Sequence, residues 1–192
     1  MGKVWSINNN FGENKKIKEN YIFILSFILP MVIMFVVFTS LGVGFIGDKT
    51  IVSSDMYTQY VAYFGKFKDI LSGDGSIFYS FNKSIGGNNI GLFAYYLASP
   101  LNLLLILFPK SAIGEFIFII YLIKIGLASL CFSLYISKVY KKKDLFVVIF
   151  SLCYALMSYN ICFQMNIMWM DGMMLLPLVA LGIEEIILKG KY

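Results

Sequence analysis

The sequence contains no histidine and only three cysteines among its 192 residues. Without histidine, the chain has no imidazole for acid–base catalysis or for metal binding. The cysteines, Cys131, Cys153 and Cys162, all lie inside apolar runs. An odd number of cysteines in such runs is typical of small core residues and argues against a disulfide framework.

Charge is also scarce: charged residues make up 14% of the chain and hydrophobic residues 59%. A soluble domain usually carries about 25% charged residues, so this chain has too little polar surface to cover a particle in water. All 16 basic residues are lysines, and many stand at the edges of apolar runs, which is a membrane-orientation pattern. We therefore expect an all-α polytopic membrane protein that contacts lipid, and no nucleic-acid partner despite the net charge of +5.

Four apolar runs predict membrane-spanning helices, since a helix of about 20 residues crosses the bilayer core. The predicted spans are 21–46, 113–137, 145–163 and 172–188. The first follows the polar segment 1–20 and is too long for the core of a signal peptide, so we expect an uncleaved helix. We expect residues 21–192 to be the N-terminal part of a longer transmembrane domain.

The apolar run 92–108 is ambiguous, because Pro100 and Asn102 interrupt it. If this run crossed the membrane, the lysine cluster at 138–143 would lie outside, against the positive-inside rule. We therefore expect a re-entrant or interfacial segment within one large external loop, 47–111. In that arrangement both chain ends lie in the cytoplasm.

An amphipathic helix is expected inside this loop, over residues 56–71. Its aromatic and aliphatic side chains recur at spacings of three and four, which marks one face of a helix. These residues are Tyr57, Tyr60, Val61, Phe64, Phe67 and Leu71. The face is expected to lie on the membrane surface or against the helix bundle.

Asp55 directly precedes that amphipathic helix, at the predicted mouth of the bundle. A carboxylate in this place, flanked by aromatic side chains, is suited to act as a general base. The same position suits an N-cap, where the carboxylate accepts backbone N–H bonds and meets the positive end of the helix dipole. The two roles are compatible.

Asp171 lies at the second predicted external turn, 164–171, close to Trp169. Tryptophan is ordinary at a membrane interface, and aspartate before glycine is ordinary in a turn. A catalytic role would require Asp171 to approach Asp55 across the bundle mouth, as paired carboxylates do in many active sites.

Lys124 lies near the middle of the predicted span 113–137. A lysine inside the membrane is costly, so its side chain should face a partner or an aqueous cavity. Two interpretations stay open. The ammonium group neutralises a lipid-linked phosphate, or it forms a structural ion pair or hydrogen bond with a neighbouring helix.

These features occur in a distinctive order along the chain. The motif Asp-x-Tyr-x-Gln-Tyr, formed by Asp55, Tyr57, Gln59 and Tyr60, follows the first predicted helix. After it come Gly86-Gly87-Asn88, the run 95–104, Lys124-Ile125-Gly126-Leu127-Ala128, the run 169–178 and Gly182-Ile183-Glu184. From about residue 20 to its end, the sequence resembles the bacterial YfhO family of polytopic membrane proteins.

The resemblance implies a fold like that of GT-C glycosyltransferases, with a helix bundle and interfacial helices in a large first external loop. It also implies sugar transfer from a polyprenyl-phosphate donor to a cell-envelope polymer, such as teichoic acid of Gram-positive bacteria, on the outer face. Acidic residues of the first external loop commonly serve catalysis in GT-C enzymes. Asp55 matches that position, and Asp171 would support it.

We further expect five side chains to contact the substrate, the aromatic ones by stacking on sugar rings. They are Tyr57, Gln59, Tyr60, Lys124 and Trp169. Members of the family are longer, so this fragment alone is expected to be inactive.

Two other functions stay open, a transporter or flippase of a lipid-linked substrate and a non-catalytic membrane scaffold. The sequence does not identify a cofactor either. Two carboxylates can hold a divalent cation through oxygen ligands, but two candidates do not make a metal site.

Overall fold

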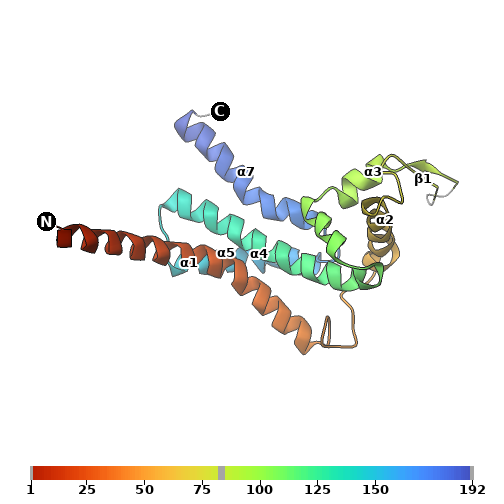
Figure 1. Cartoon of the computed structure of the whole chain (residues 1–192), viewed down its shortest axis with the longest axis horizontal. Helices are drawn as coiled ribbons and strands as arrows, with labels where there is room; N and C mark the ends of the chain where they lie inside the picture. Colours follow the sequence, from red (N-terminus) through yellow and green to blue (C-terminus); the bar gives the residue numbers. More distant parts are fainter. Residues whose placement is uncertain (1, 82–84, 191–192) are drawn as a thin grey trace.

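The computed structural model describes residues 2–81 and 85–190. Four long helices dominate these residues (Figure 1): α1 (Gly2–Ser40), α4 (Ile113–Tyr140), α5 (Leu145–Ala155) and α7 (Trp169–Lys189). The only named strands among the described residues are β1 (Tyr79–Ser80) and β2 (Gly87–Asn88), which pair antiparallel. The prediction of an all-α membrane protein is confirmed, because the rest of the regular structure is helical.

Two helical stretches are long and apolar enough to cross a membrane, Asn20–Ser40 and Lys110–Tyr140. They correspond to the predicted spans 21–46 and 113–137. A helix pair in the loop, Ile90–Leu97 and Pro100–Leu107, passes the same test only if counted together, and it is bent by 89°. The run 92–108 is therefore not a straight crossing helix.

The predicted span 145–163 is divided in the structure. Helix α5 ends at Ala155, and a separate short helix, α6 (Ser158–Cys162), follows. The side chain of Asn160 explains the break, because its Nδ2 donates to the carbonyl oxygens of Tyr154 at 3.2 Å and Ala155 at 2.9 Å. Those carbonyls lie at the end of α5, where carbonyl groups run out of regular helical partners, and the Asn160 side chain supplies an additional donor.

Helix α4 is the centre of the bundle, with α1, α5 and α7 packed around it. Its Phe116, Ile117 and Ile120 are fully buried. Helix α1 bends (Figure 1) near Pro30, which has no N–H to continue the helical hydrogen bonds. At the bend, α1 and α4 approach closely at Gly126. An added Cβ there would lie 2.8 Å from both the Met31 Cγ and the Phe27 carbonyl oxygen.

The loop between α1 and α4 folds over one end of α4 as a set of short helices. These are the π-helix η1 (Met56–Tyr60), α2 (Val61–Leu71), α3 (Ile90–Leu92), the π-helix η2 (Phe93–Leu97) and the 3-10 helices η3 (Pro100–Leu107) and η4 (Lys110–Ala112). Tyr60, Phe64 and Phe67 of the predicted stripe are buried, whereas Tyr57 is 73% exposed. The wider turn of the π-helix rotates Tyr57 away from that face.

The bundle has two distinct ends (Figure 1). The loop helices and the first residues of α4 and α7 gather at one end, which we call the loop end. The last residues of α4 and α7 and the first residues of α1 lie toward the other end. This second end carries the lysine cluster at 138–143, and we call it the lysine end.

Candidate functional site

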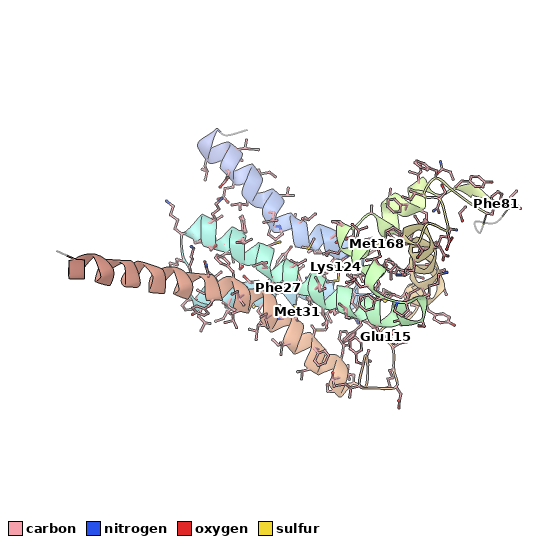
Figure 2. The ribbon with its side chains drawn as sticks, viewed as in Figure 1. Phe27, Met31, Phe81, Glu115, Lys124 and Met168 are labelled. Atoms are coloured by element: carbon pink, nitrogen blue, oxygen red, sulfur yellow. The ribbon has the colours of Figure 1, made fainter. Side chains whose placement is uncertain are left out.

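A buried ion pair joins α4 to α7. Lys124, whose side chain is 1% exposed, places its Nζ 2.9 Å from Asp171 Oδ2 and donates to the Ile167 carbonyl oxygen at 2.9 Å. Figure 2 shows Lys124 at this meeting of the two helices, beside Met168. Because α7 begins at Trp169, Asp171 lies in its first turn and not in the turn predicted before residue 172. The helix dipole favours a carboxylate in this position.

The ion pair is also bonded to the bent segment of the loop between α1 and α4. The Ser99 hydroxyl donates to Asp171 Oδ1 at 3.1 Å. Ser99 lies at the bend between η2 and η3, where its extended backbone and the following Pro100 end one helix and begin the next. Both oxygens of the Asp171 carboxylate are thus hydrogen-bonded, one to α4 and the other to the loop. The hydrogen bonds among Lys124, Asp171 and Ser99 thus connect the bent segment to the bundle.

An aromatic layer lies at the loop end of the bundle. It consists of Tyr60, Tyr63, Tyr95, Tyr96 and Trp169, whose rings pack against one another or share hydrogen bonds. The Tyr96 hydroxyl donates to Gln59 Oε1 at 2.9 Å, and the Trp169 Nε1–H donates to the Tyr95 hydroxyl oxygen at 3.4 Å. The Tyr60 hydroxyl contacts the Met168 sulfur. The layer therefore links η1, η2 and α7 in one surface.

Asp55 stands at the edge of this layer and is exposed. It occupies the N-cap position of η1, but its side chain makes no capping hydrogen bond. Burial raises the pKa of Tyr60 above its usual value, and the charges of Tyr96, Tyr95 and Asp55 raise it further. Tyr60 therefore stays protonated at neutral pH, and the Asp55 carboxylate lies within electrostatic reach of its hydroxyl.

A family model for the bacterial membrane protein YfhO matches residues 26–192. The chain belongs to the YfhO family. Searches of curated proteins and of solved structures found no match. The family match covers every element of the site, from the apolar part of α1 to α7, and it confirms the resemblance inferred from the motifs. Together with the apolar helices, it identifies a membrane protein.

The structure brings some of the predicted site residues of this YfhO family chain together and separates others. Lys124 and Asp171 are in contact, as the structural interpretation of Lys124 required. Tyr60 and Gln59 lie in the aromatic layer, close to the ring system that reaches Trp169. The contacts of the Asp171 carboxylate go to Lys124 and Ser99, and Asp55 is not one of its hydrogen-bonding partners.

Sequence reasoning missed three residues that help to build this arrangement, Ser99, Tyr95 and Tyr96. All three fall in the run 95–104, which contributes to the resemblance but contains no charged side chain. Their positions become meaningful only once the bend at Ser99 is known. The signal available in the sequence was the Ser99-Pro100 pair, because a residue before proline is biased toward extended backbone.

No group of three or more cysteine, aspartate or glutamate side chains is placed to hold a metal ion within residues 2–81 and 85–190. Asp55 is exposed, whereas the charge of Asp171 is already balanced by Lys124. The arrangement can deprotonate a hydroxyl at Asp55 and can present aromatic rings and hydrogen-bond donors to a polar ligand.

Proposed function

We propose that this YfhO family chain contributes the acceptor-activating part of a membrane glycosyltransferase. The exposed carboxylate of Asp55 carries the proposal, because it stands beside an aromatic layer and has no capping hydrogen bond. A carboxylate that makes no capping hydrogen bond to the helix can accept a proton from a substrate. Aromatic faces next to it suit the apolar faces of sugar rings.

The proposed reaction transfers a sugar from a polyprenyl-phosphate donor to a hydroxyl group of a cell-envelope polymer, such as teichoic acid. Asp55 takes the proton of the acceptor hydroxyl while the acceptor oxygen bonds to the anomeric carbon. The bond between that carbon and the phosphate oxygen breaks, and polyprenyl phosphate leaves with the electron pair. The phosphate is a good leaving group, so positioning and deprotonation are the main tasks of the protein.

The other site residues have distinct proposed roles. Tyr57 is exposed beside Asp55 and would stack on the sugar, and Trp169 at 39% exposure would do so from α7. Gln59 would orient the acceptor from η1, and the buried Tyr60 would hold η1 against Met168. Asp171 would support the reaction by fixing the loop, because Lys124 and Ser99 occupy its two oxygens.

The proposal places the loop end outside the cell and the lysine end in the cytoplasm. The lysines at 138–143 support this orientation through the positive-inside rule. Both ends of the described chain then lie on the cytoplasmic side, and the protein is a multi-pass protein of the bacterial cell membrane.

The test uses the full-length protein in a deletion strain. Wild type, Asp55→Asn and the control Asp74→Asn are restored at matched membrane abundance, and the sugars on purified teichoic acid are quantified. Asp74 is an exposed carboxylate of the same loop that lies in the turn after α2. We expect wild type and Asp74→Asn to restore the sugar and Asp55→Asn to fail. Equal restoration by all three variants would remove Asp55 from catalysis.

A second candidate function is transport of a lipid-linked substrate, favoured by one observation. The Lys124–Asp171 pair lies in the helix bundle, where ionisable side chains often mark transport paths. A flippase would lose translocation of a labelled lipid-linked sugar in vesicles when Lys124 is replaced. A transferase with Asp55→Asn would still bind its donor but fail to transfer the sugar, and this difference separates the two functions.

A further inference from the structure

The short helix η2 lies between the two elements that carry the proposed site. Asp55 directly precedes η1, whereas Trp169 is the first residue of α7. Side chains of η2 are bonded to both elements. The distance between the Asp55 carboxylate and the Trp169 ring therefore depends on how η2 is held against each of them.

On one side, η2 is joined to η1 and α2 by a hydrogen bond and by aromatic contacts. The Tyr96 hydroxyl donates to Gln59 Oε1 at 2.9 Å. The centroid of the same ring lies 5.3 Å from that of Tyr60 and 4.8 Å from that of Tyr63. Aromatic pairs at such spacings contribute stability beyond the area that they bury. Tyr96 thus fixes η1, and with it the backbone of Asp55, to η2.

On the other side, hydrogen bonds join this segment to the first turn of α7. The Trp169 Nε1–H donates to the Tyr95 hydroxyl oxygen at 3.4 Å, which is long for a hydrogen bond. The Ser99 hydroxyl donates to Asp171 Oδ1 at 3.1 Å. This second bond has a charged acceptor and is the stronger of the two. Ser99 therefore supplies the main polar attachment of the segment to α7.

The bend that carries Ser99 is held by a buried hydrogen bond. Asn102 is 2% exposed, and its Nδ2 donates across the bend to the Leu97 carbonyl oxygen at 3.2 Å. The following Pro100 biases the backbone of Ser99 toward the extended conformation that it adopts. Because the bend is closed in this way, a shift of Ser99 moves η2 with it.

There is also a direct contact between η1 and the residue before α7, in which the Tyr60 hydroxyl meets the Met168 sulfur. A methionine side chain is flexible and adapts to its surroundings. This contact can fill the space between the two elements without fixing their distance, whereas the hydrogen bonds of η2 are directional. The directional connection from α7 to η1 therefore runs through η2.

We propose that Ser99 is a positioning residue of the transferase site. It does not touch the substrate but sets the distance between the proton-accepting carboxylate of Asp55 and the stacking ring of Trp169. The inference rests on the proposed function, because the sugar held by Trp169 and the hydroxyl group deprotonated by Asp55 belong to one reaction. A small displacement of such groups lowers the rate of that reaction.

The same bond contributes less to stability than to geometry. The Asp171 side chain is 24% exposed, so a water molecule can replace the Ser99 hydroxyl as a donor to it. Loss of that hydroxyl should therefore change the melting temperature little while it releases η2 from α7.

The first test compares wild type, Ser99→Ala, Ser99→Thr and Ser76→Ala of the full-length protein in the deletion strain, at matched membrane abundance. The rate at which sugar appears on teichoic acid after induction is measured. We expect Ser99→Ala to lower this rate about tenfold. Ser99→Thr should restore most of it, because threonine keeps the hydroxyl group and suits an extended backbone.

Ser76→Ala is the matched control from the same loop. The Ser76 hydroxyl oxygen accepts a local hydrogen bond from the Phe78 N–H at 3.1 Å, so its loss leaves η2 in place. We expect this variant to transfer sugar at the wild-type rate. Wild-type transfer by Ser99→Ala, or an equal loss in Ser99→Ala and Ser76→Ala, would overturn the positioning role.

A second measurement tests the geometry without the reaction. The fluorescence of Trp169 in each purified full-length protein is obtained as the difference from the same protein carrying Trp169→Phe, and its quenching by acrylamide is compared. We expect Ser99→Ala to increase the quenching, because Tyr95 moves away from the indole ring. Ser99→Thr and Ser76→Ala should match wild type. An unchanged Trp169 signal in Ser99→Ala would overturn the inference whatever the transfer rate.

The two measurements separate failure of this inference from failure of the proposed function. If wild type adds no sugar to teichoic acid, the proposed function fails and the role of Ser99 in transfer falls with it. An increase in Trp169 quenching in Ser99→Ala would then support only the attachment of η2 to α7. If wild type transfers sugar and Ser99→Ala does so equally well, the proposed function stands and the inference is wrong.

Discussion

The charged side chains at the two ends of this bundle differ in their exposure to solvent and in the number of elements that they connect. At the loop end, Lys124 is 1% exposed and Asp171 is 24% exposed, and the pair is bonded across three elements, α4, α7 and the bent loop segment. At the lysine end, the pair Lys138–Glu185 is 59% and 33% exposed. A lysine–carboxylate pair thus connects secondary-structure elements inside the protein at one end, whereas a similar pair lies on the surface at the other end.

The comparison shows that depth, and not charge, decides what an ion pair contributes. A buried ammonium group without its carboxylate keeps the full cost of its desolvation, whereas an exposed one is solvated by water. The loop end therefore depends on its polar contacts for its shape. The lysine end keeps its charged pair Lys138–Glu185 at the surface.

The largest expected effect comes from breaking the buried pair. Asp171→Asn leaves the Lys124 ammonium group, which is 1% exposed, without its carboxylate, and we expect a loss of about 3 kcal/mol of stability. Thermal unfolding of the full-length protein in detergent measures it. The double variant Lys124→Met/Asp171→Asn should regain a large part of the loss, because no charge is then stranded. A double variant as unstable as the single one would show that packing, and not charge pairing, explains the effect.

The next effect tests the apolar contact of α1 with α4. Gly126→Ala adds a Cβ that would meet the Met31 side chain and the Phe27 carbonyl oxygen at 2.8 Å. We expect a destabilisation of about 1–3 kcal/mol, typical of overpacking. Gly182→Ala is the control, because its Cβ meets nothing within 4 Å, and alanine there should leave stability unchanged or raise it slightly. Similar melting temperatures for the two variants would contradict the close approach.

A smaller effect is expected in the aromatic layer. Tyr96→Phe keeps the ring contacts but removes the hydroxyl that donates to Gln59. We expect a loss of about 0.5–1.5 kcal/mol, the usual net value of one hydrogen bond. Limited proteolysis of the external loop should become faster in this variant. An unchanged cleavage rate would show that the bond does not hold η1 and η2 together.

The smallest effect belongs to the lysine end. Lys138→Gln removes an exposed ion pair with Glu185, and we expect a change of at most about 1 kcal/mol that fades as salt is added. The melting temperature at low and high ionic strength measures it. A loss as large as that of Asp171→Asn would contradict the difference between the two ends.

Part of the site could be inferred from sequence and part could not. Lys124 in an apolar helix required a partner on energetic grounds, and one of the two interpretations named an ion pair with a neighbouring helix. The sequence did not identify Asp171 as that partner, because an aspartate before Gly172 is typical of a turn. The hydrogen bond from Ser99 to Asp171 could not be inferred either, since nothing in an uncharged serine before proline indicates a partner far away in the sequence.

The amphipathic helix shows the same division. The spacing of Tyr60, Phe64 and Phe67 predicted their burial, and the structure buries all three. Tyr57 followed the same spacing but is exposed, because the first turn is a π-helix. A pattern read at the α-helical period cannot anticipate a local change of helix type.

The sequence by itself determined that this chain is a helical membrane protein of the YfhO family, because hydropathy, lysine placement and motif order are local properties of the chain. It also indicated that the apolar part of α1 and the whole of α4 are long and apolar enough to span a membrane, because about 20 apolar residues in a helix match the thickness of the bilayer core. Tertiary structure alone decided which charges meet, where α5 breaks and how the loop bends at Ser99. Those outcomes depend on contacts between residues far apart in the chain, and no local pattern encodes them.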